Sequence, residues 1–511
     1  MTTEGQRAVI DFLSDPASYP SAVDRVDRID THCSIVFLAG AKAYKLKRAV
    51  RLPYLDYGTV ELRRRMCEAE VALNRRTAPA LYEGFVPVVR DAAGHLRLDG
   101  QGEAVDWLVV MRRFAESDAL NRMAERGALS EPIVEALADA IAAFHDKAET
   151  SREYGGPEAM ARVLDSNRQA FAVSDPAILD AAEIERLDAM SRRALDRQAG
   201  LLVRRRAGGK VRHCHGDLHL RNIVMLDGHP VPFDGIEFDD ALAWIDVLYD
   251  LAFLLMDLDH RGLRGLANLV FNRYLAATDE WDGLALMPIF LACRAAIRAH
   301  VSATAVSTQA DPTRARAFAS DAESYLRHAF ECLAPKPARL VAIGGLSGTG
   351  KSTLARALAP HLGVAPGAVI LRSDVLRKTL FGVAPTARLP PEAYLPEINE
   401  RVYARIHALA HTTVGGGHSA VADAVFARPA ERAEIEIVAR EHGASFTGLW
   451  LEAPLGALEG RIEARQGDAS DATVAVLHQQ QHYQLGPIGW HRLDASGPPE
   501  RTLAEARRII G

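Results

Sequence analysis

The chain has 511 residues, of which 48% are hydrophobic and 25% charged, and its formal net charge at pH 7 is −6. This composition excludes disorder and fibrous structure, and the length supports two or three hydrophobic cores. The small negative charge argues against a broad nucleic-acid-binding surface and makes a nucleic-acid partner unexpected, although a local basic groove stays open. The five cysteines contain no C-x-x-C pair and give neither a metal-ligand pattern nor a disulfide framework.

The first sixteen residues are polar and acidic, unlike a signal peptide. The most apolar segment, around Leu248 to Leu258, is interrupted by Asp250 and Asp257. Charges inside such a short segment argue against a membrane span. We therefore expect a cytoplasmic protein without a membrane partner.

The region 30–115 is rich in strand-forming residues. Ser34–Ala39 and Ala43–Lys47 flank a turn at Gly40, which predicts a β-hairpin. The same region is predicted to contain a helix over 60–77 and a third strand over Trp107–Met111.

Residues 116–335 are predicted to be mostly helical. Apolar residues from Ile133 to Phe144 recur at helical spacing, with Ser130 as the expected N-cap and Pro132 in the first turn. A loop-and-strand passage over 213–238 interrupts this region. A small strand-bearing lobe before a larger helical lobe is the layout of a kinase-like fold.

Two prolines in Ala334–Ala338 mark a linker, because proline resists both helix and central strand. The alternation that follows predicts an α/β domain with a parallel sheet. Its expected elements are strands at 339–344, 368–373, 418–423 and 446–451, and a helix at 351–359. We thus predict domains at 1–334, with lobes of about 1–115 and 116–334, and at 339–511.

The passage His215-Gly216-Asp217-Leu218-His219-Leu220-Arg221-Asn222, followed by Phe233-Asp234, is the first chemical signature. Asp217 and Asn222 have the spacing of the base and the metal-binding Asn in kinase catalytic loops. Asp234 follows on a short strand, where such folds keep a second metal carboxylate. Either of the first two residues alone would be read as a turn cap, but all of them in register favour a kinase.

This H-G-D-x-H-x-x-N passage followed by F-D resembles the aminoglycoside phosphotransferase family of small-molecule kinases. The resemblance implies an α+β bilobal protein-kinase-like domain. It also implies that Asp217 is the catalytic base and that Asn222 and Asp234 bind Mg²⁺. Asp250 resembles the helix Asp that braces the catalytic loop in that family.

Such a fold also needs a lysine on a strand and a glutamate on the following helix. Lys45 and Lys47 both qualify and share one strand face, and Lys45 better matches the family's apolar-Lys-apolar pattern. Glu70 is the expected partner, because it lies on an apolar helix face where an acid needs a partner, whereas Glu68 lies on another face. A solvated hairpin charge remains the alternative for Lys45.

The nucleotide contacts of this half are expected from two other segments. The strand end at Met111 resembles the hinge that binds adenine through backbone groups. No glycine-rich loop precedes Lys45, and Thr31-His32-Cys33-Ser34 stands in its place. We expect Ser34 to contact phosphate through its hydroxyl or N–H group.

The second signature is Gly345-Leu346-Ser347-Gly348-Thr349-Gly350-Lys351-Ser352, a complete P-loop between an apolar strand and a helix. Backbone N–H groups and the helix N-terminus cradle phosphates in such a loop. Lys351 reaches the β- and γ-oxygens, and Ser352 holds Mg²⁺. We assign nucleotide binding to Gly345, Ser347, Gly348, Thr349, Gly350, Lys351, Ser352 and Thr353.

Asp374 ends the next predicted strand, at the edge that faces the phosphate crevice. It could accept the proton of a substrate hydroxyl, with Arg377 one turn on holding an anionic substrate or the transferring phosphate. This D-x-x-R resembles P-loop kinases of the polynucleotide-kinase and zeta-toxin kind. The alternative for Asp374 is a helix N-cap.

Three further residues complete the expected P-loop site. Asp423, at the end of a strand, resembles a Walker-B carboxylate that positions Mg²⁺. Arg461 and Arg465 lie four apart on a helix predicted over Leu455–Arg465, as lid arginines do, and their alternative is a solvated surface. The absence of an N-K-x-D signature favours ATP over GTP.

The whole chain resembles the bacterial bifunctional aminoglycoside phosphotransferase/ATP-binding family. We therefore expect a tandem small-molecule kinase that uses ATP and Mg²⁺ and phosphorylates a hydroxyl. Two alternatives stay open: a nucleotide sensor that gates the other half, and a toxin-like kinase acting on nucleotide sugars or nucleic acid. An acidic run permits a polycationic acceptor or simple structural capping: Glu237, Asp239, Asp240 and Asp246.

Overall fold

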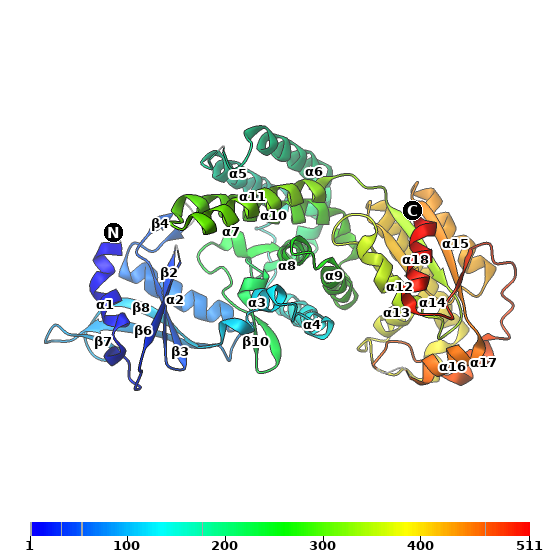
Figure 1. Cartoon of the computed structure of the whole chain (residues 1–511), viewed down its shortest axis with the longest axis horizontal. Helices are drawn as coiled ribbons and strands as arrows, with labels where there is room; N and C mark the ends of the chain where they lie inside the picture. Colours follow the sequence, from blue (N-terminus) through cyan, green and yellow to red (C-terminus); the bar gives the residue numbers. More distant parts are fainter. Residues whose placement is uncertain (1–2, 32, 53–54, 176, 465–466) are drawn as a thin grey trace. The chain divides into compact units, whose positions relative to one another are not determined.

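The structure is a computed structural model that describes residues 3–31, 33–52, 55–175, 177–464 and 467–511 (Figure 1). Internal contacts divide the chain into two compact units. The first comprises Met1–Ala159 and Arg204–Leu251, and the second comprises Met160–Val203 and Ala252–Gly511. The predicted linker at 334–338 lies inside the second unit, between helix α11 (Pro312–Leu333) and strand β13 (Arg339–Gly344).

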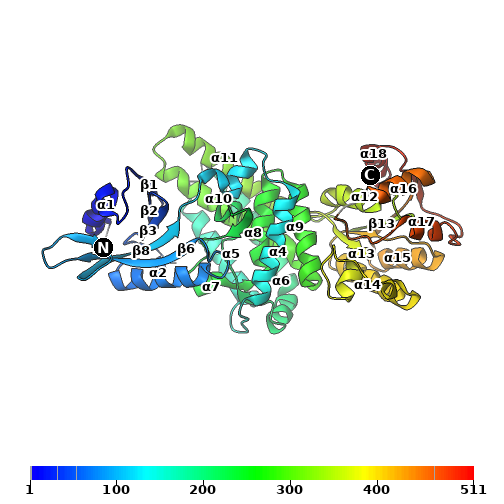
Figure 2. The same ribbon diagram turned by 90° about the horizontal axis from the view of Figure 1, so that it is seen from below.

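A six-stranded antiparallel sheet forms the first part of the first unit, in the order β1-β2-β3-β8-β6-β7. Alternating side chains of β2 and β3 supply two apolar faces. One face carries Phe37 and Leu46 under α1, and the other carries Ala43 and Val109 under α2. Figure 2 shows these two helices on opposite faces of the sheet. The elements are α1 (Arg7–Ser14), β1 (Val26–Asp30), β2 (Ser34–Ala39), β3 (Lys42–Lys47), α2 (Val60–Asn74), β6 (Tyr82–Arg90), β7 (Leu96–Leu98) and β8 (Glu103–Arg112).

The predicted hairpin is confirmed, with Ala39 paired to Lys42 around the turn. The predicted helix ends at Asn74 rather than at residue 77. Strand β6 escaped prediction because Pro87 and Gly84 weaken its strand pattern, and its ladder shifts register twice.

The predicted loop-and-strand passage over 213–238 of the first unit consists of short elements. A one-turn 3₁₀ helix at Leu220–Asn222 lies between strands β9 and β10, as expected for a loop-and-strand passage. Helix α4 begins after Ser130, so the N-cap position was predicted correctly. The Ser130 side chain, however, makes no capping hydrogen bond. The elements are α3 (Leu120–Glu125), α4 (Glu131–Lys147), β9 (Val211–His213), β10 (Ile223–Leu226), β11 (His229–Pro232), α7 (Asp240–Ala243) and β12 (Trp244–Asp246). Helices α5 (Gly156–Ala172), α6 (Ala181–Ala207) and α8 (Val247–His260) belong partly to each unit.

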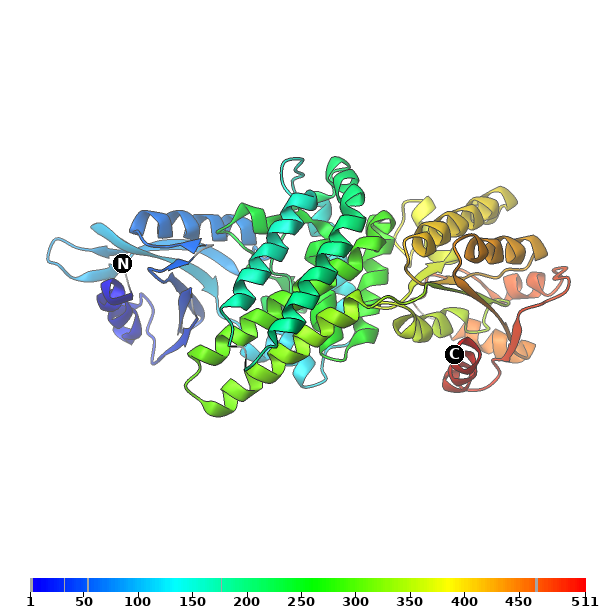
Figure 3. The ribbon, with the colours of Figure 1, turned by 90° about the horizontal axis from the view of Figure 1, so that it is seen from above.

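Helices α9 (Arg264–Thr278), α10 (Met287–Thr308) and α11 begin the rest of the second unit. Figure 3 shows α10 and α11 side by side as a helical hairpin. Among the described residues, the stretch long and apolar enough to cross a membrane is Trp281–Ser307. Its most apolar window is 67% buried inside the protein, which is the burial of a core helix. The sequence alone indicated Leu248–Leu258 as the most apolar segment.

A five-stranded parallel sheet forms the remainder, in the order β14-β15-β13-β16-β17. Helices α12 and α18 cover one face, and α14 and α15 cover the other (Figure 2). The predicted α/β alternation is confirmed, although the polar edge strand β17 was missed. The elements are α12 (Lys351–Leu358), β14 (Val369–Arg372), α13 (Ser373–Leu380), α14 (Pro396–Gly415), β15 (Ala420–Asp423), α15 (Pro429–Glu441), β16 (Ser445–Glu452), α16 (Leu455–Glu463), α17 (Val474–Gln480), β17 (His491–Asp494) and α18 (Pro499–Ile510).

Helix α9 covers the outer edge of β14. The Asn272 side chain accepts a hydrogen bond from the N–H of Ile370 at 2.6 Å, and Asn268 donates to the carbonyl of Ala368 at 3.0 Å. An edge strand otherwise exposes unpaired backbone groups. These two asparagines therefore replace the missing neighbour strand and fix the strand that leads to Asp374.

Candidate active sites

Buried Asp250 holds the loop of the first unit that carries Asp217. Its carboxylate accepts hydrogen bonds from the N–H groups of His215 at 3.0 Å and Gly216 at 2.9 Å, and it lies 3.1 Å from Nε2 of His145. Gly216 has φ +83°, and a Cβ there would lie 2.9 Å from the carbonyl oxygen of Leu242. The loop conformation thus depends on a carboxylate with two acceptor atoms and on a glycine.

We expect Asp250→Asn to destabilise the protein by about 1–3 kcal/mol, because an amide offers one acceptor oxygen to two buried N–H donors. Phosphate transfer by this half should fall as well, since the loop carrying Asp217 loses its support. Urea unfolding and transfer assays measure the two effects. The exposed Asp99→Asn serves as the matched control, and equal stability of the two variants would contradict the expectation.

Asp217, Asn222 and Asp234 are the residues of this unit for which the sequence predicted a catalytic or metal-binding role. The Asn222 amide N–H donates to Oδ2 of Asp217 at 2.8 Å and to its carbonyl oxygen at 3.0 Å, which leaves the amide oxygen for a metal. Asp234 adopts φ +62°, and its N–H donates to the hydroxyl of Tyr82 at 3.1 Å. These oxygens are the hard donors that suit Mg²⁺.

Lys45 joins this carboxylate to helix α2. Its ammonium donates to Glu70 at 2.8 Å and to Asp234 at 2.5 Å. Burial lowers the pKa of Lys45, but Asp234 and Glu70 outweigh that and raise it well above its usual value. Glu68 instead lies on the exposed side of α2 and pairs with Arg64. The lysine and glutamate chosen from the sequence therefore meet.

Lys47 was considered from the sequence but not assigned a role, and it is fully buried. Its ammonium donates to the second oxygen of Glu70 at 2.6 Å and also to Glu237. The hydroxyl of Tyr57 donates to Glu237 at 2.7 Å. Glu70 is thus shared by two lysines, which tie β3 to the segment that follows Asp234.

The lowered pKa of Glu70 leads us to expect that the stability of the fold depends on pH. Burial raises the pKa of this carboxyl, but Lys45 and Lys47 outweigh that and lower it to about 2, from an ordinary value of 4.5. A carboxyl whose pKa is depressed by folding stabilises the fold above its unfolded pKa. That contribution, about 3 kcal/mol, should be lost as the pH falls from about 4.5 to about 2.

The measurement is urea unfolding from pH 6 to pH 2 for the wild type and Glu70→Gln. The difference in the free energy of unfolding between the wild type and Glu70→Gln should shrink as the pH falls. Glu68→Gln, an exposed change on the same helix, should follow the wild type at every pH. A constant difference for Glu70→Gln would contradict the assignment.

Most of the acidic run after Asp234 is already engaged within the protein. Glu237 pairs with Lys47, and Asp246 accepts two hydrogen bonds from Arg205 at 2.7 and 2.9 Å. Asp239 caps α7 through the N–H of Ala241 at 2.8 Å. These residues match the capping interpretation of the run better than an acidic cleft for a polycation.

The two expected nucleotide contacts have different surroundings. The hydroxyl of Thr31 donates to the carbonyl of Ser34 and accepts from its N–H, both at 3.0 Å, which ties Thr31 to the first residue of β2. Met111 lies inside β8, paired with Ala43 and Tyr82 on its two sides. Strand β8 ends at Arg112, one residue after Met111, and the adenine contact expected at this strand end stays a prediction.

The P-loop curls around the carbonyl of Leu346, which accepts hydrogen bonds from the Thr349 hydroxyl at 2.8 Å and from Lys351 at 2.9 Å. Gly345, Gly348 and Gly350 all have positive φ. A Cβ at Gly345 would lie 2.6 Å from the carbonyl oxygen of Leu451. The loop therefore needs glycine both for its backbone and for its close neighbours.

Further contacts place the other P-loop residues. The N–H of Ser347 donates to the buried side chain of Gln480 at 2.8 Å, a contact with no sequence signal. Thr353 is exposed in the first turn of α12. The Ser352 hydroxyl donates to Asp423 at 2.6 Å. A hydroxyl and a carboxylate oxygen at this distance are a fitting donor pair for Mg²⁺.

Arg372, which the sequence did not single out, lies among three carboxylates. Its guanidinium is 2.5 Å from Asp468, 3.6 Å from Asp423 and 3.9 Å from Asp374. Asp374 is the second residue of α13, not the last residue of β14 as predicted, because the strand ends at Arg372. Burial raises the pKa of Asp374, and Arg372 opposes this rise.

The predicted arginines have backbone partners. Arg377 is buried and donates to the carbonyl of Ala393 and to Asn399, both at 2.7 Å, so two of its nitrogens hold the chain rather than an anion. Arg461 donates to the carbonyl of Ala495 at 2.8 Å. The helix predicted over Leu455–Arg465 ends at Glu463, and Arg465 lies outside the described residues.

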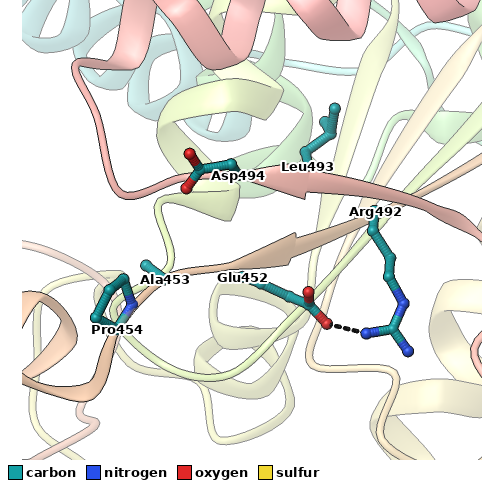
Figure 4. Close-up of a pocket in the computed structure, with 6 residues that line it drawn as sticks. All are labelled: Glu452, Ala453, Pro454, Arg492, Leu493 and Asp494. Atoms are coloured by element: carbon teal, nitrogen blue, oxygen red, sulfur yellow. Dashed lines mark hydrogen bonds and ion pairs between the residues drawn. The ribbon is translucent and has the colours of Figure 1, made fainter.

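A cavity of about 410 Å³ lies at the carboxyl ends of β16 and β17. It is lined by Glu452 at the end of β16, by Ala453 and Pro454 that follow it, and by Arg492, Leu493 and Asp494 of β17. Glu452 and Arg492 point to the same side and form an ion pair at 2.6 Å (Figure 4). Arg461 donates to the carbonyl of Ala495, the residue after Asp494, and therefore lies beside this cavity.

Two protein families match the two halves. The Phosphotransferase enzyme family matches residues 60–286, and a family described as AAA domain matches residues 340–486. An adenylyl-sulfate kinase of Myxococcus xanthus is 33% identical over 117 residues, covering 23% of this chain and 59% of that protein. The crystal structure of a choline/ethanolamine kinase family protein from Mesorhizobium loti aligns with a TM-score of 0.37 at 14% identity, covering 63% of this chain and 99% of that one.

Relatives also match the chain over nearly its full length. An uncharacterized protein of Mycobacterium tuberculosis strain H37Rv is 30% identical over 491 residues, which is 95% of each chain, and one from Mycobacterium bovis matches equally. A kinase-like half and a P-loop half thus occur in the order that the sequence predicted. The chain belongs to the bacterial family in which an aminoglycoside phosphotransferase-like kinase domain is fused to a P-loop kinase domain.

Proposed function

We propose that both halves, residues 1–334 and 339–511, transfer the γ-phosphate of ATP to a hydroxyl of a small molecule. One observation carries this proposal. Each half combines a carboxylate able to take a proton with separate oxygen donors that fit Mg²⁺ and with a lysine for the phosphates. The sets are Asp217 with Asn222, Asp234 and Lys45, and Asp374 with Ser352, Asp423 and Lys351.

In the first half, Asp217 accepts the proton of the acceptor hydroxyl and orients its oxygen toward the γ-phosphorus. Asn222 supports this role because its amide already holds one oxygen of Asp217 at 2.8 Å. Lys45 binds the phosphates while Glu70 fixes its position. Mg²⁺, when bound by Asn222 and Asp234, supplies the positive charge that neutralises the phosphates.

In the second half, the loop glycines and the start of α12 bind the phosphates. Lys351 contacts the phosphoryl group that is being transferred. Asp374 takes the proton of the acceptor. Its partial burial supports this role, because desolvation raises its pKa and a raised pKa makes a carboxylate a better base near neutral pH. Ser352 and Asp423 would hold Mg²⁺, and the cavity beside Arg461 is our candidate for the adenine.

The acceptor of the first half is proposed to be a small molecule that is not a polycation. Three of the four acids in the run after Asp234 already have partners within the protein. In the second half, Arg377 is proposed to hold the acceptor-side segment 391–399, not an anion, because its bonds to Ala393 and Asn399 use two of its nitrogens.

The test is a screen of transfer from labelled ATP to sugars, nucleosides, aminoglycosides and cell extract. The full chain is compared with Asp217→Asn, with Lys351→Ala and with the double variant. Each single variant should lose a different set of labelled products, and the double variant should lose all of them. ATP binding by the first half with no product dependent on Asp217 would instead support the nucleotide-sensor interpretation.

A further inference from the structure

Charged side chains of the first unit form a row in which negative and positive charges alternate. In order, they are Asp234, Lys45, Glu70, Lys47 and Glu237. The ammonium of Lys45 lies 2.5 Å from Asp234 and 2.8 Å from one oxygen of Glu70. The ammonium of Lys47 lies 2.6 Å from the other oxygen of Glu70 and also pairs with Glu237. Because Asp234 and Glu237 are close in the chain, two lysines of β3 hold both ends of one short segment.

The two ends of this row differ in exposure. At the first end, the side chain of Asp234 is 41% exposed and that of Lys45 is 15% exposed. At the other end, the side chains of Lys47 and Glu237 are 1% and 6% exposed. The first pair is therefore accessible to a nucleotide phosphate or to a metal ion, and the second pair is not. The first pair can exchange partners when ligands bind, while the second keeps its own.

A tyrosine closes the buried end of the row. The hydroxyl of Tyr57 donates to Oε1 of Glu237 at 2.7 Å, and the ammonium of Lys47 lies 3.3 Å from the same hydroxyl. The ammonium also lies over the ring of Tyr57, 4.9 Å from its centre. Oε1 of Glu237 thus has one charged and one neutral donor, which compensate the burial of the carboxylate.

The backbone of the segment between the two ends is held as well. The N–H of Gly235 donates to the side chain of Asn74 at 2.8 Å. The N–H of Ile236 donates to the carbonyl of His215 at 2.9 Å. Loss of the anchor at the last residue of the segment should loosen these two hydrogen bonds, which report on the position of its first residue, the proposed metal ligand.

We propose that Lys47 and Glu237 are positioning residues, which hold the rest of the row in place while Lys45 turns to the phosphates of the nucleotide. This inference rests on the proposed function, in which Lys45 binds phosphate and Asp234 binds Mg²⁺. Glu70 is fully buried, and an unpaired buried charge is strongly unfavourable. Lys47 remains as the partner of Glu70 when Lys45 is shared with the nucleotide.

The first measurement is hydrogen exchange of the Gly235 and Ile236 amides in the full-length protein without nucleotide. The double variant Lys47→Met/Glu237→Gln removes both charges, so that position 237 carries no buried unpaired charge. The two amides should exchange about tenfold faster than in the wild type, because the end of their segment is released. Tyr57→Phe keeps both charges and removes one hydrogen bond, so the same amides should exchange about two- to tenfold faster.

The second measurement is the Mg²⁺ concentration that gives half-maximal formation of the products dependent on Asp217. The full-length protein carries Lys351→Ala to silence the P-loop half. Lys47→Met/Glu237→Gln should raise this concentration about tenfold, the cost typical of removing a group that orients a metal ligand. A pair with a purely structural role would lower the melting temperature and leave the Mg²⁺ requirement unchanged.

Lys42→Met/Glu83→Gln is the matched control, because it removes an exposed ion pair, 2.7 Å long, that also includes a lysine of β3. It should match the wild type in both measurements. Unchanged exchange in Lys47→Met/Glu237→Gln, or faster exchange with an unchanged Mg²⁺ requirement, would overturn the positioning role. If the double variant does not fold, the same outcomes in Tyr57→Phe decide.

The exchange measurement needs no turnover, so it separates this inference from the proposed function. If no product depends on Asp217, the proposed function of the first half fails. Exchange then decides alone whether the buried pair anchors the segment that begins at Asp234.

Discussion

Lys351→Ala is expected to lower ATP turnover by the P-loop half about 10²- to 10³-fold, the loss typical when one preorganised charge stabiliser is removed. The ammonium already points into the loop, where it donates to the carbonyl of Leu346 at 2.9 Å. Phosphates would replace that carbonyl as its partner. Alanine removes the charge while the glycine-rich backbone keeps its fold, so binding of ATP should weaken less than turnover falls.

The assay is phosphate release and transfer in the Asp217→Asn background. Lys336→Ala, an exposed lysine in the linker, is the matched control and should behave as the parent does. Products that depend on Asp217 should persist in the single Lys351→Ala variant. Loss of those products as well would show that the two halves are coupled.

The elements that could be predicted from the sequence are those with strong local signals. The P-loop, its strand and its helix follow from glycine spacing and apolar periodicity. The parallel sheet follows from the alternation of strands and helices. Strand β6 was missed because Pro87 interrupts its pattern, and β17 because three of its four residues are exposed. Edge and bulged strands depend on their neighbours more than on their own residues.

The sites divide in the same way. Asp217, Asn222 and Asp234 are close in sequence and carry a motif, so their proximity could be predicted. Arg372 carries no motif, and Lys47 was a candidate only beside the preferred Lys45. Both residues pair with carboxylates that lie far away in the chain.

Arg377 illustrates the reverse case. Its spacing from Asp374 predicted an anion ligand, but Tyr394 and Asn399 enclose it from a segment whose position no local pattern specifies. A spacing motif therefore identifies a residue near a site without fixing which partner the residue takes. The predicted lid role of Arg461 and Arg465 also depended on spacing alone. Arg461 likewise has a backbone partner, the carbonyl of Ala495.

Asp217→Asn is expected to reduce transfer by the first half about 10²- to 10⁴-fold, the range for loss of a general base. The change preserves size, and Asn222 can still donate to the remaining carbonyl oxygen at position 217. The KM for ATP should therefore change little while kcat falls. Removing the Lys45 side chain should instead raise the KM for ATP, because that lysine is proposed to bind the phosphates.

Steady-state rates with the acceptor found in the screen measure this difference between kcat and KM. Asp99→Asn, at an exposed loop position with φ +60°, is the matched control, since asparagine tolerates that backbone conformation as well as aspartate does. Equal loss in kcat and in ATP affinity would mean that Asp217 holds the nucleotide rather than activating the acceptor. A rate that stays within about twofold of the wild type would remove Asp217 as the base, because that range is far below the cost of losing one.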